Sequence, residues 1–230
     1  MPLLYSIGKI TVGHVMTLGW RPRVEGLEHI PTTGGAIFAG NHLSVADELF
    51  LGAVVPRHIA FWAKAEYFRG GGFGGNVTKF VLEGLGAIKV ERGGGRAALA
   101  AFDGAIPVLK SGDMVAVYPE GTRSPDGRLY RGRTGAARLA VAAGVPIIPV
   151  GVLGTEKVQP IGQPYPKLVG PGKITVKFGK PIETADRADD RTSLRALTDE
   201  VMSEIQKLTG QEYVPRYAPP RGQPAAEDGA

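Results

Sequence analysis

A histidine and an aspartate five positions apart are the residues best suited to chemistry in this chain of 230 residues. His42 and Asp47 follow an apolar run at 34–40, which predicts a buried strand, and a helix is expected to begin at Val45 with Ser44 as its cap. The chain then folds back between the two side chains, which could bring the carboxylate to one nitrogen of the imidazole. The other nitrogen would be free to accept a proton near neutral pH, as a general base does.

These residues alone leave a second interpretation open. A single histidine often satisfies a buried polar group, and Asp47 could be a surface residue of the predicted helix. Cations elsewhere in the chain favour the catalytic interpretation. Lys64, Arg92 and Arg123 each follow a predicted strand, where open α/β sheets place their chemistry. An arginine fork fits two oxygens of a phosphate or carboxylate, so Arg92 and Arg123 indicate an anionic substrate, and Lys64 could join them.

The turn that carries Arg123 contains further candidate residues. Pro119 ends the predicted strand at 114–118, and Gly121 permits an unusual backbone angle or a close approach by substrate. Glu120 either bonds backbone groups of the turn or forms a salt bridge with a neighbouring arginine. The residues do not decide between these two roles.

Composition limits the partners without choosing one. The formal charge is +5 and the pI is about 9.5, which favours phosphorylated small molecules, an anionic membrane face or nucleic acid. Cysteine is absent, so disulfides and thiolate chemistry are excluded, and with no signal peptide recognised we expect a cytosolic compartment.

The first 22 residues predict a helix that lies in a membrane interface. One helical stripe is largely apolar and consists of Leu3, Ile7, Ile10, His14 and Leu18. The segment barely reaches spanning length and carries Lys9, so a transmembrane helix is not expected. Trp20 and the arginines that follow would lie at headgroup level. The alternative is a helix packed against the protein's own core.

The rest of the chain alternates between strand and helix patterns. Strands are predicted at 24–30, 35–39, 57–63, 86–92, 114–118, 145–151 and 173–178, and helices at 77–85, 94–110, 133–143 and 194–208 besides the one after Ser44. This order predicts an α/β fold with a mixed, largely parallel central sheet flanked by helices. Prolines in the strand at 145–151 indicate a sheet edge or a strand beside a substrate channel. Gly70–Gly75 is expected to be a flexible loop. We predict three parts, namely the N-terminal helix at 1–22, an α/β domain at 23–212 and a Pro/Gly-rich tail at 213–230.

Four stretches together resemble the sequence blocks of the glycerolipid acyltransferase superfamily, most closely those of bacterial 1-acyl-glycerol-3-phosphate acyltransferases. They are Asn41-His42 with Asp47, residues 86–92, residues 119–123 and residues 145–150, and the resemblance covers roughly residues 30–180. The resemblance implies that His42 is the general base and that Asp47 orients it. It also implies that Arg92 and Arg123, joined by Lys64, bind the phosphate of the acceptor, and that Glu120, Gly121 and Thr122 shape the acceptor site. The fourth block is tied to acyl-donor binding or to the sheet core.

The implied reaction is acyl transfer from acyl-CoA to the sn-2 hydroxyl of lysophosphatidate, giving phosphatidate in phospholipid biosynthesis. No metal and no cofactor is expected besides acyl-CoA as co-substrate. Glycerol-3-phosphate, another lysophospholipid or a glycolipid remains an alternative acceptor, and acyl carrier protein an alternative donor carrier. We expect a peripheral or monotopic protein on the cytoplasmic face of the cell membrane. The Gly70–Gly75 loop departs from the family pattern and leaves the membrane-facing geometry open.

Two rival functions follow from the same residues. A hydrolase would use Ser44 as nucleophile, or a metal on His42, Asp47 and Glu120, but Ser44 lacks a nucleophile-elbow context. A non-catalytic protein would bind anionic lipid or nucleic acid through its basic surface. No nucleic-acid motif is present, so a nucleic-acid partner is not expected.

Overall fold

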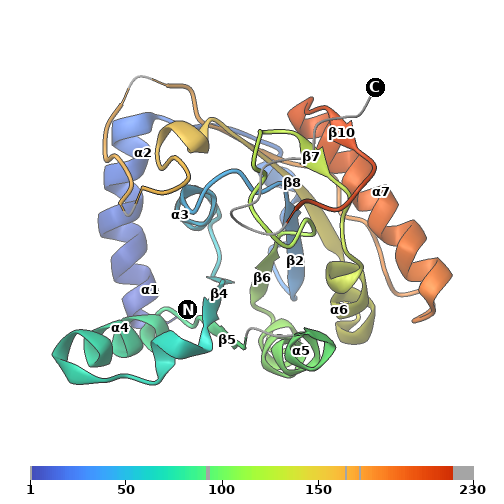
Figure 1. Ribbon diagram of the computed structural model, residues 1–230, viewed down its shortest axis with the longest axis horizontal. Coiled ribbons are helices and arrows are strands. Elements are labelled where there is room, and N and C mark those ends of the chain that lie inside the picture. Colours follow the sequence, from blue (N-terminus) through green and yellow to red (C-terminus); the bar gives the residue numbers. More distant parts are fainter. Residues whose placement is uncertain (1, 92–93, 164, 171, 220–230) are drawn as a thin grey trace.

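The computed structural model describes residues 2–91, 94–163, 165–170 and 172–219, with the backbone alone for 94–101. Its centre is a six-stranded sheet in the order β1-β9-β8-β2-β6-β3 (Figure 1). The strands are β1 (Arg23–Glu25), β2 (Ala36–Gly40), β3 (Ile59–Ala60), β6 (Met114–Val117), β8 (Ile147–Leu153) and β9 (Thr175–Phe178). All neighbouring pairs are parallel except β8 and β9, which are antiparallel. The predicted mixed, largely parallel sheet is therefore confirmed.

Helices cover both faces of this sheet. One face carries α3 (Ala46–Val54) and the N-terminal helices, whereas the other carries α5 (Gly94–Lys110), α6 (Gly135–Ala143) and α7 (Arg191–Thr209) (Figure 1). Strand β2 shows how the sequence builds both layers. Ala36 and Phe38 belong to the core on the α3 side, and Ile37 and Ala39 belong to the core on the α7 side. Because successive side chains of a strand point to opposite faces, a continuous apolar run suits a sheet that is buried on both faces.

The N-terminal segment is helical from residue 3 to residue 20. It consists of α1 (Leu3–Gly8), a π-helical turn η1 (Lys9–Gly13) and α2 (His14–Trp20). Its inward side contributes Tyr5, Met16 and Trp20 to the buried residues. The alternative that this helix packs against the protein's own core is therefore confirmed for its inward side. The predicted stripe lies on the other side of the helix and is exposed along its whole length, so a membrane-interface role for it stays a prediction. Trp20 is only 4% exposed, so its predicted place at headgroup level is wrong.

Strand β8 differs from its prediction. The prolines indicated an edge or channel-side strand, but β8 lies between β2 and β9 and its residues 147–152 are buried. Pro149 pairs with Ala39 of β2, and the ladder to β9 begins only one residue later, at Val150. On the β9 side Pro149 acts as an acceptor from the Gly179 N–H. An interior proline is tolerated here because no ladder bond needs its missing N–H.

Other elements depart from the predicted boundaries. The strand predicted at 24–30 shortens to β1 and is followed by η2 (Leu27–His29). The strand predicted at 57–63 divides into β3 and β4 (Trp62–Lys64), and β4 pairs with β5 (Ile88–Val90) in a separate two-stranded sheet. The stretch Gly70–Gly75, predicted as a loop, is partly helical. It follows η3 (Ala65–Phe68), and α4 (Gly72–Gly84) begins inside it.

The C-terminal segment is held by contacts as far as the structure describes it. A short strand β10 (Tyr213–Val214) pairs in parallel with β7 (Leu129–Tyr130), and Val214 and Ala218 are buried. Helix α7 precedes it and ends at Gly210 in the left-handed conformation, as its sequence predicts. The chain therefore returns to the segment after β6, where β10 and β7 form a separate two-stranded sheet.

Candidate active site

His42 and Asp47 are in direct contact. The distance from His42 Nδ1 to Asp47 Oδ2 is 2.8 Å, and the Asp47 side chain is fully buried while 15% of the His42 side chain is exposed. The interpretation of Asp47 as a surface residue is therefore wrong. With Nδ1–H donated to the carboxylate, Nε2 is the nitrogen left to accept a proton.

The turn between the two residues is built around the same carboxylate. Asp47 Oδ2 also accepts the backbone N–H groups of Leu43 and Ser44, at 2.8 and 2.9 Å. The Thr155 hydroxyl, in η4 (Thr155–Lys157), donates to the other oxygen, Oδ1. Asp47 sits in the first turn of α3, where the helix dipole also favours a negative charge. The carboxylate thus shapes the loop and holds the imidazole at one position.

Neighbouring side chains fix the loop from both ends. The buried Asn41 exchanges two hydrogen bonds of 2.8 Å with the backbone of Val152, which ties the end of β2 to β8. Ser44 is buried, donates to Gln159 O at 2.8 Å and accepts the Ala46 N–H at 3.1 Å. The helix begins at Ala46 with Val45 at its N-cap, so the predictions that it begins at Val45 and that Ser44 caps it are each off by one residue. The Ser44 hydroxyl is engaged in these two hydrogen bonds to the backbone, which argues against Ser44 as a nucleophile.

Glu120 bonds backbone groups rather than an arginine. Its Oε1 accepts the N–H of His42 at 3.1 Å and its Oε2 accepts the N–H of Tyr130 at 3.0 Å. Burial raises the pKa of Glu120 to about 7, and the two N–H bonds only partly offset that effect. The loop is further closed by the Ser124 N–H, which donates to His42 O at 2.7 Å. Of the two predicted roles for Glu120, the structure has the first.

The ring of Tyr118 stacks on the imidazole. The centroids of Tyr118 and His42 are 3.9 Å apart and the two planes differ by 13°. The Tyr118 hydroxyl oxygen is buried and has no hydrogen-bond partner among the described residues. Burial raises the pKa of Tyr118 well above its usual value, so the phenol is neutral. The stacked ring of Tyr118 covers one face of the His42 imidazole, and both residues line a cavity.

A cavity of about 300 Å³ lies beside His42. It is lined by His42, Trp62, Val117, Tyr118, Gly121, Thr122 and Arg123. Gly121 has a φ of 75°, and a Cβ there would lie 3.2 Å from the Arg133 side chain, so this turn requires glycine. Three of the predicted site residues, Arg123, Gly121 and Thr122, are thus brought to His42.

The other two predicted cations are Lys64 and Arg92. Lys64 does not line the cavity, and its ammonium lies 5.4 Å from the centre of the Tyr67 ring. It does share a face of β4 with Trp62, which is a wall of the cavity, because residues two apart in a strand point the same way. Arg92 lies outside the described residues, so its prediction is not tested.

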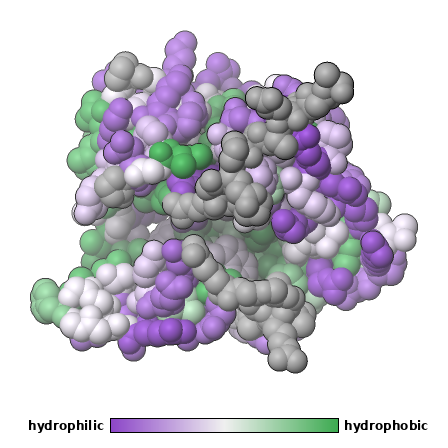
Figure 2. Space-filling model, viewed as in Figure 1, coloured by the Kyte–Doolittle hydropathy of each residue, from purple (hydrophilic) through white to green (hydrophobic). Residues whose placement is uncertain are grey.

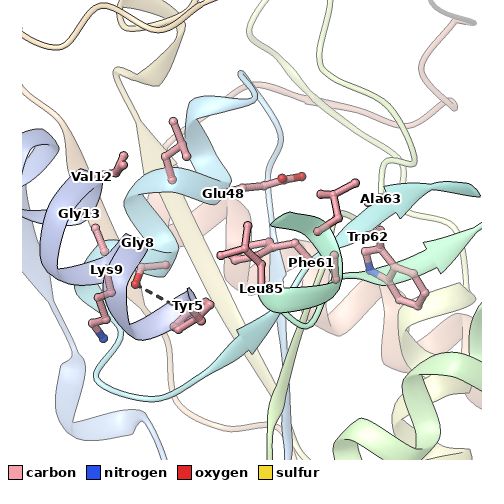
Figure 3. Close-up of a pocket in the computed structure, with 15 residues that line it drawn as sticks. Tyr5, Gly8, Lys9, Val12, Gly13, Glu48, Phe61, Trp62, Ala63 and Leu85 are labelled. Carbon is pink, nitrogen blue, oxygen red and sulfur yellow. Dashed lines mark hydrogen bonds between the residues drawn. The ribbon is translucent and has the colours of Figure 1, made fainter. Parts of the chain in front are cut away.

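A second, apolar cavity of about 280 Å³ opens between the N-terminal helices, α3, α4 and β4. Its walls include Gly8, Val12, Leu49, Phe61, Leu82 and Leu85 (Figure 3). Glu48 reaches from α3 towards Ala63, and Trp62 lines both this cavity and the one beside His42. Burial raises the pKa of Glu48 to about 7, the neighbouring Asp47 raises it further and Arg123 lowers it.

Several site residues escaped prediction because they come from distant segments. Trp62, Tyr118 and Thr155 meet His42 or Asp47 only after the sheet has formed, and no spacing pattern marks them. Tyr118 lies directly before the predicted turn at 119–123, and this position is the only feature of the sequence that could have marked it as a site residue. Among the described residues, no cluster of three or more His, Asp or Glu side chains could hold a metal ion.

Comparison with known proteins points to one family. A family model described as Acyltransferase matches residues 21–153. The 1-acyl-sn-glycerol-3-phosphate acyltransferase of Bacillus subtilis is 27% identical over 84% of this chain and 91% of its own length. A chloroplastic enzyme of the same name from Arabidopsis thaliana is 29% identical over 71% of this chain. The crystal structure of the 1-acyl-sn-glycerophosphate acyltransferase PlsC from Thermotoga maritima superposes with a TM-score of 0.63 at 29% identity, covering 90% of this chain and 83% of that one.

The matched lengths differ between these relatives. The chain spans 44% of the Arabidopsis protein and 45% of a Brassica napus protein of the same type. The matched region of the family model contains His42, Asp47, Glu120 and Arg123. Similarity therefore extends over the whole cavity beside His42.

Proposed function

Because this chain belongs to the acyltransferase family, we propose that it transfers an acyl group from acyl-CoA to the sn-2 hydroxyl of 1-acyl-glycerol-3-phosphate, giving phosphatidate for phospholipid synthesis. One observation carries the proposal. The imidazole of His42 is fixed by a buried carboxylate beside a cavity whose wall contains Arg123. The names of the relatives support the choice of lysophosphatidate as acceptor.

The proposed reaction is a direct transfer. His42 Nε2 takes the proton of the sn-2 hydroxyl as that oxygen attacks the thioester carbon. The resulting tetrahedral intermediate collapses, the carbon–sulfur bond breaks, and the imidazolium returns the proton to the departing thiolate of CoA. Asp47 stabilises the imidazolium while it exists. The products are phosphatidate and free CoA, and no nucleophile of the chain is needed because the thioester is already activated.

The cations position the acceptor. Arg123 lies on the turn that borders the cavity, and its planar fork suits two oxygens of a phosphate monoester. Lys64 ends β4, which also carries the cavity residue Trp62, and Arg92 follows β5, the partner of β4. We propose that both side chains turn towards the phosphate when the acceptor binds. Binding energy from the phosphate then places the hydroxyl against His42, which raises the rate of the chemical step.

The apolar cavity is proposed to hold the acyl chain of the donor. It lies on the other side of Trp62 from the His42 cavity, and its walls come mostly from apolar side chains and glycines. A thioester near Trp62 would present its carbonyl carbon to His42 while the hydrocarbon is removed from water. Leu49 lines this cavity, and Leu49→Trp would fill part of it. The variant is expected to prefer a shorter acyl chain on the donor and to keep the KM for the acceptor unchanged.

The exposed stripe of the N-terminal helices is proposed to lie in the membrane interface. Leu3, Ile10 and Leu18 are 76%, 66% and 73% exposed. None of the helices in the described ranges is long and apolar enough to cross a bilayer. We propose a peripheral or monotopic protein on the cytoplasmic side of the cell membrane, where both substrates are available.

The test of this function supplies the purified protein with palmitoyl-CoA and a panel of acceptors. The panel holds lysophosphatidate, glycerol-3-phosphate, lysophosphatidylcholine and a glycolipid, and CoA release is followed with positional analysis of the product. The proposal expects lysophosphatidate to be acylated at sn-2 with the highest kcat/KM. A higher kcat/KM for any other acceptor would show that lysophosphatidate is not the preferred acceptor. Palmitoyl acyl carrier protein supplied in place of palmitoyl-CoA tests which donor carrier the protein uses.

A further inference from the structure

A groove at the end of α2 combines apolar and cationic walls. It has an open volume of about 1100 Å³ and lies between α2 and the segment that leads into β9. Its apolar walls include Val15, Leu18 and Val169, and its cationic walls are Arg21, Arg23 and Lys173. The site beside His42 uses none of these residues.

The segment 165–170 is firmly attached to α2. Trp20 Nε1 donates to Lys167 O at 2.9 Å. Glycines allow the close packing, because a Cβ at Gly19 would lie 2.3 Å from Leu168 O and a Cβ at Gly170 would lie 2.5 Å from the Trp20 ring. The segment is therefore a fixed extension of the N-terminal helices.

This attachment turns large apolar side chains outward. Leu168 and Val169 are 53% and 70% exposed, beside Leu18, which is 73% exposed. Tyr165 is more exposed still. Single exposed apolar residues are ordinary, but a contiguous group beside an exposed apolar helix marks an interaction surface. The upper part of the molecule near α2 shows hydrophobic residues among hydrophilic ones (Figure 2).

The cations around this group are held at its border. Arg21 is exposed and has a φ of 45°, the one positive φ of a non-glycine residue in the described ranges. The left-handed conformation costs energy for a residue with a side chain. At Arg21 this conformation ends α2 and directs the chain towards β1. Lys167 and Lys173 are also exposed, whereas Arg23 pairs with Glu25 at 2.7 Å.

We propose that the Leu168 face, defined as Val15, Leu18, Arg21, Leu168, Val169 and Lys173, continues the exposed N-terminal stripe at Leu18 and binds an anionic phospholipid bilayer. The apolar side chains enter the interface and the cations meet lipid phosphates, which is the arrangement of amphipathic interfacial segments. The proposal deepens the proposed function and rests on it. A second copy of the chain suits the face poorly, because a twofold contact would set Arg21 and Lys173 near their own counterparts.

Vesicle binding tests the proposal with two sets of variants. The first set is the double variant Leu168→Glu with Val169→Glu. Its matched control is Thr192→Glu with Ala196→Glu, which adds the same charge at exposed positions of α7, on the opposite side of the molecule. The second is Arg21→Gln with Lys173→Gln. Co-sedimentation uses vesicles of phosphatidylcholine alone and of phosphatidylcholine with phosphatidylglycerol.

The expected results differ between the variants. The Leu168 pair lowers the partition into anionic vesicles at least about tenfold, while the α7 pair binds like the unmodified chain. The Arg21 pair lowers it by roughly 30-fold on anionic vesicles at low salt and leaves neutral vesicles unaffected. All variants keep their activity on a short-chain, water-soluble acceptor. That assay reports the proposed function separately, so its failure is distinguishable from failure of the membrane contact.

Two outcomes would overturn the proposal. One is vesicle binding by both variant pairs that equals that of the unmodified chain. The other is self-association of the unmodified chain, seen by sedimentation velocity, that the Leu168 pair abolishes without changing vesicle binding. The face would then be an interface between copies.

Discussion

Asp47 combines a structural and a proposed chemical task in one carboxylate. It accepts two backbone N–H groups, one hydroxyl and the His42 ring, so the loop and the base are held by the same atoms. A carboxylate can accept this number of bonds, whereas an amide has only one accepting oxygen. The residue therefore cannot be replaced by its amide without cost.

Asp47→Asn is expected to lower kcat by roughly 10²- to 10⁴-fold, because an amide neither fixes the His42 tautomer nor stabilises the imidazolium. It should also lower the free energy of unfolding by about 1–3 kcal/mol, since one buried donor loses its acceptor. Steady-state kinetics and urea unfolding measure the two effects. Asp199→Asn, on the exposed surface of α7, is the control. Full activity in the Asp47 variant would show that the contact has no catalytic role.

Tyr118 is expected to support His42 through its ring and not through its hydroxyl. Tyr118→Phe keeps the stacking and removes a buried hydroxyl that has no described partner, so kcat should change by less than about twofold. Tyr118→Leu removes the aromatic face that stabilises an imidazolium. It should lower kcat roughly three- to thirty-fold, as steady-state kinetics would measure. A kcat of the Leu variant equal to that of the unmodified protein would show that the stacked ring has no role in the reaction.

At the scale of elements, Glu120 joins two segments that meet only at the site. Its two oxygens connect the loop after β2 with Tyr130, the last residue of β7, across a buried position. The arrangement explains why a carboxylate occurs where the sequence also allowed an ion pair. The turn at 119–123 can then present Arg123 and Gly121 to the cavity.

Glu120→Gln removes one of these acceptors. The amide leaves either the His42 or the Tyr130 N–H unsatisfied, which should cost about 1–3 kcal/mol of unfolding free energy and lower kcat as the loop shifts. Chemical denaturation and kinetics at one pH measure both changes. Glu212→Gln, whose side chain is 70% exposed, should change neither. Unchanged stability of the Glu120 variant would contradict its role as a connector.

The elements also show what the sequence can predict. Strand β2 and helix α7 follow from local apolar patterns, and the His42–Asp47 contact follows from a strand, a turn and a helix start that are close in the chain. Pro149 could not be placed, because its tolerance depends on where the ladder to β9 begins. Trp20 could not be placed either, since its partner Lys167 is 147 residues away. Patterns within one segment are predictable, whereas contacts between distant segments depend on the assembled sheet.

At the scale of the whole molecule, the buried carboxyl group of Glu120 and the half-buried one of Glu48 link stability to pH. Glu48 and Glu120 both have pKa values raised to about 7 from an ordinary value of 4.5. Between pH 4.5 and about pH 7 the two carboxyl groups stay protonated in the folded chain but are ionised in the unfolded chain. Their contribution to stability is therefore fully present below pH 4.5 and is lost as the pH rises through about 7.

Glu48→Gln removes one of these ionisations. The unfolding free energy of the unmodified chain should fall between about pH 5 and about pH 8, and the variant should lose part of that decline, on the order of 2 kcal/mol. Urea unfolding at both pH values measures the difference. Glu156→Gln, at an exposed position, should keep the full decline. The same decline in the Glu48 variant would contradict a proton held at Glu48.

The most direct test of the central claim compares the unmodified protein with His42→Ala on palmitoyl-CoA and lysophosphatidate. The account predicts sn-2 acylation with release of one CoA per phosphatidate, and a loss of at least roughly 10³-fold in kcat for the variant, with lysophosphatidate binding retained. Acyl transfer by His42→Ala at a rate within tenfold of the unmodified protein would contradict it.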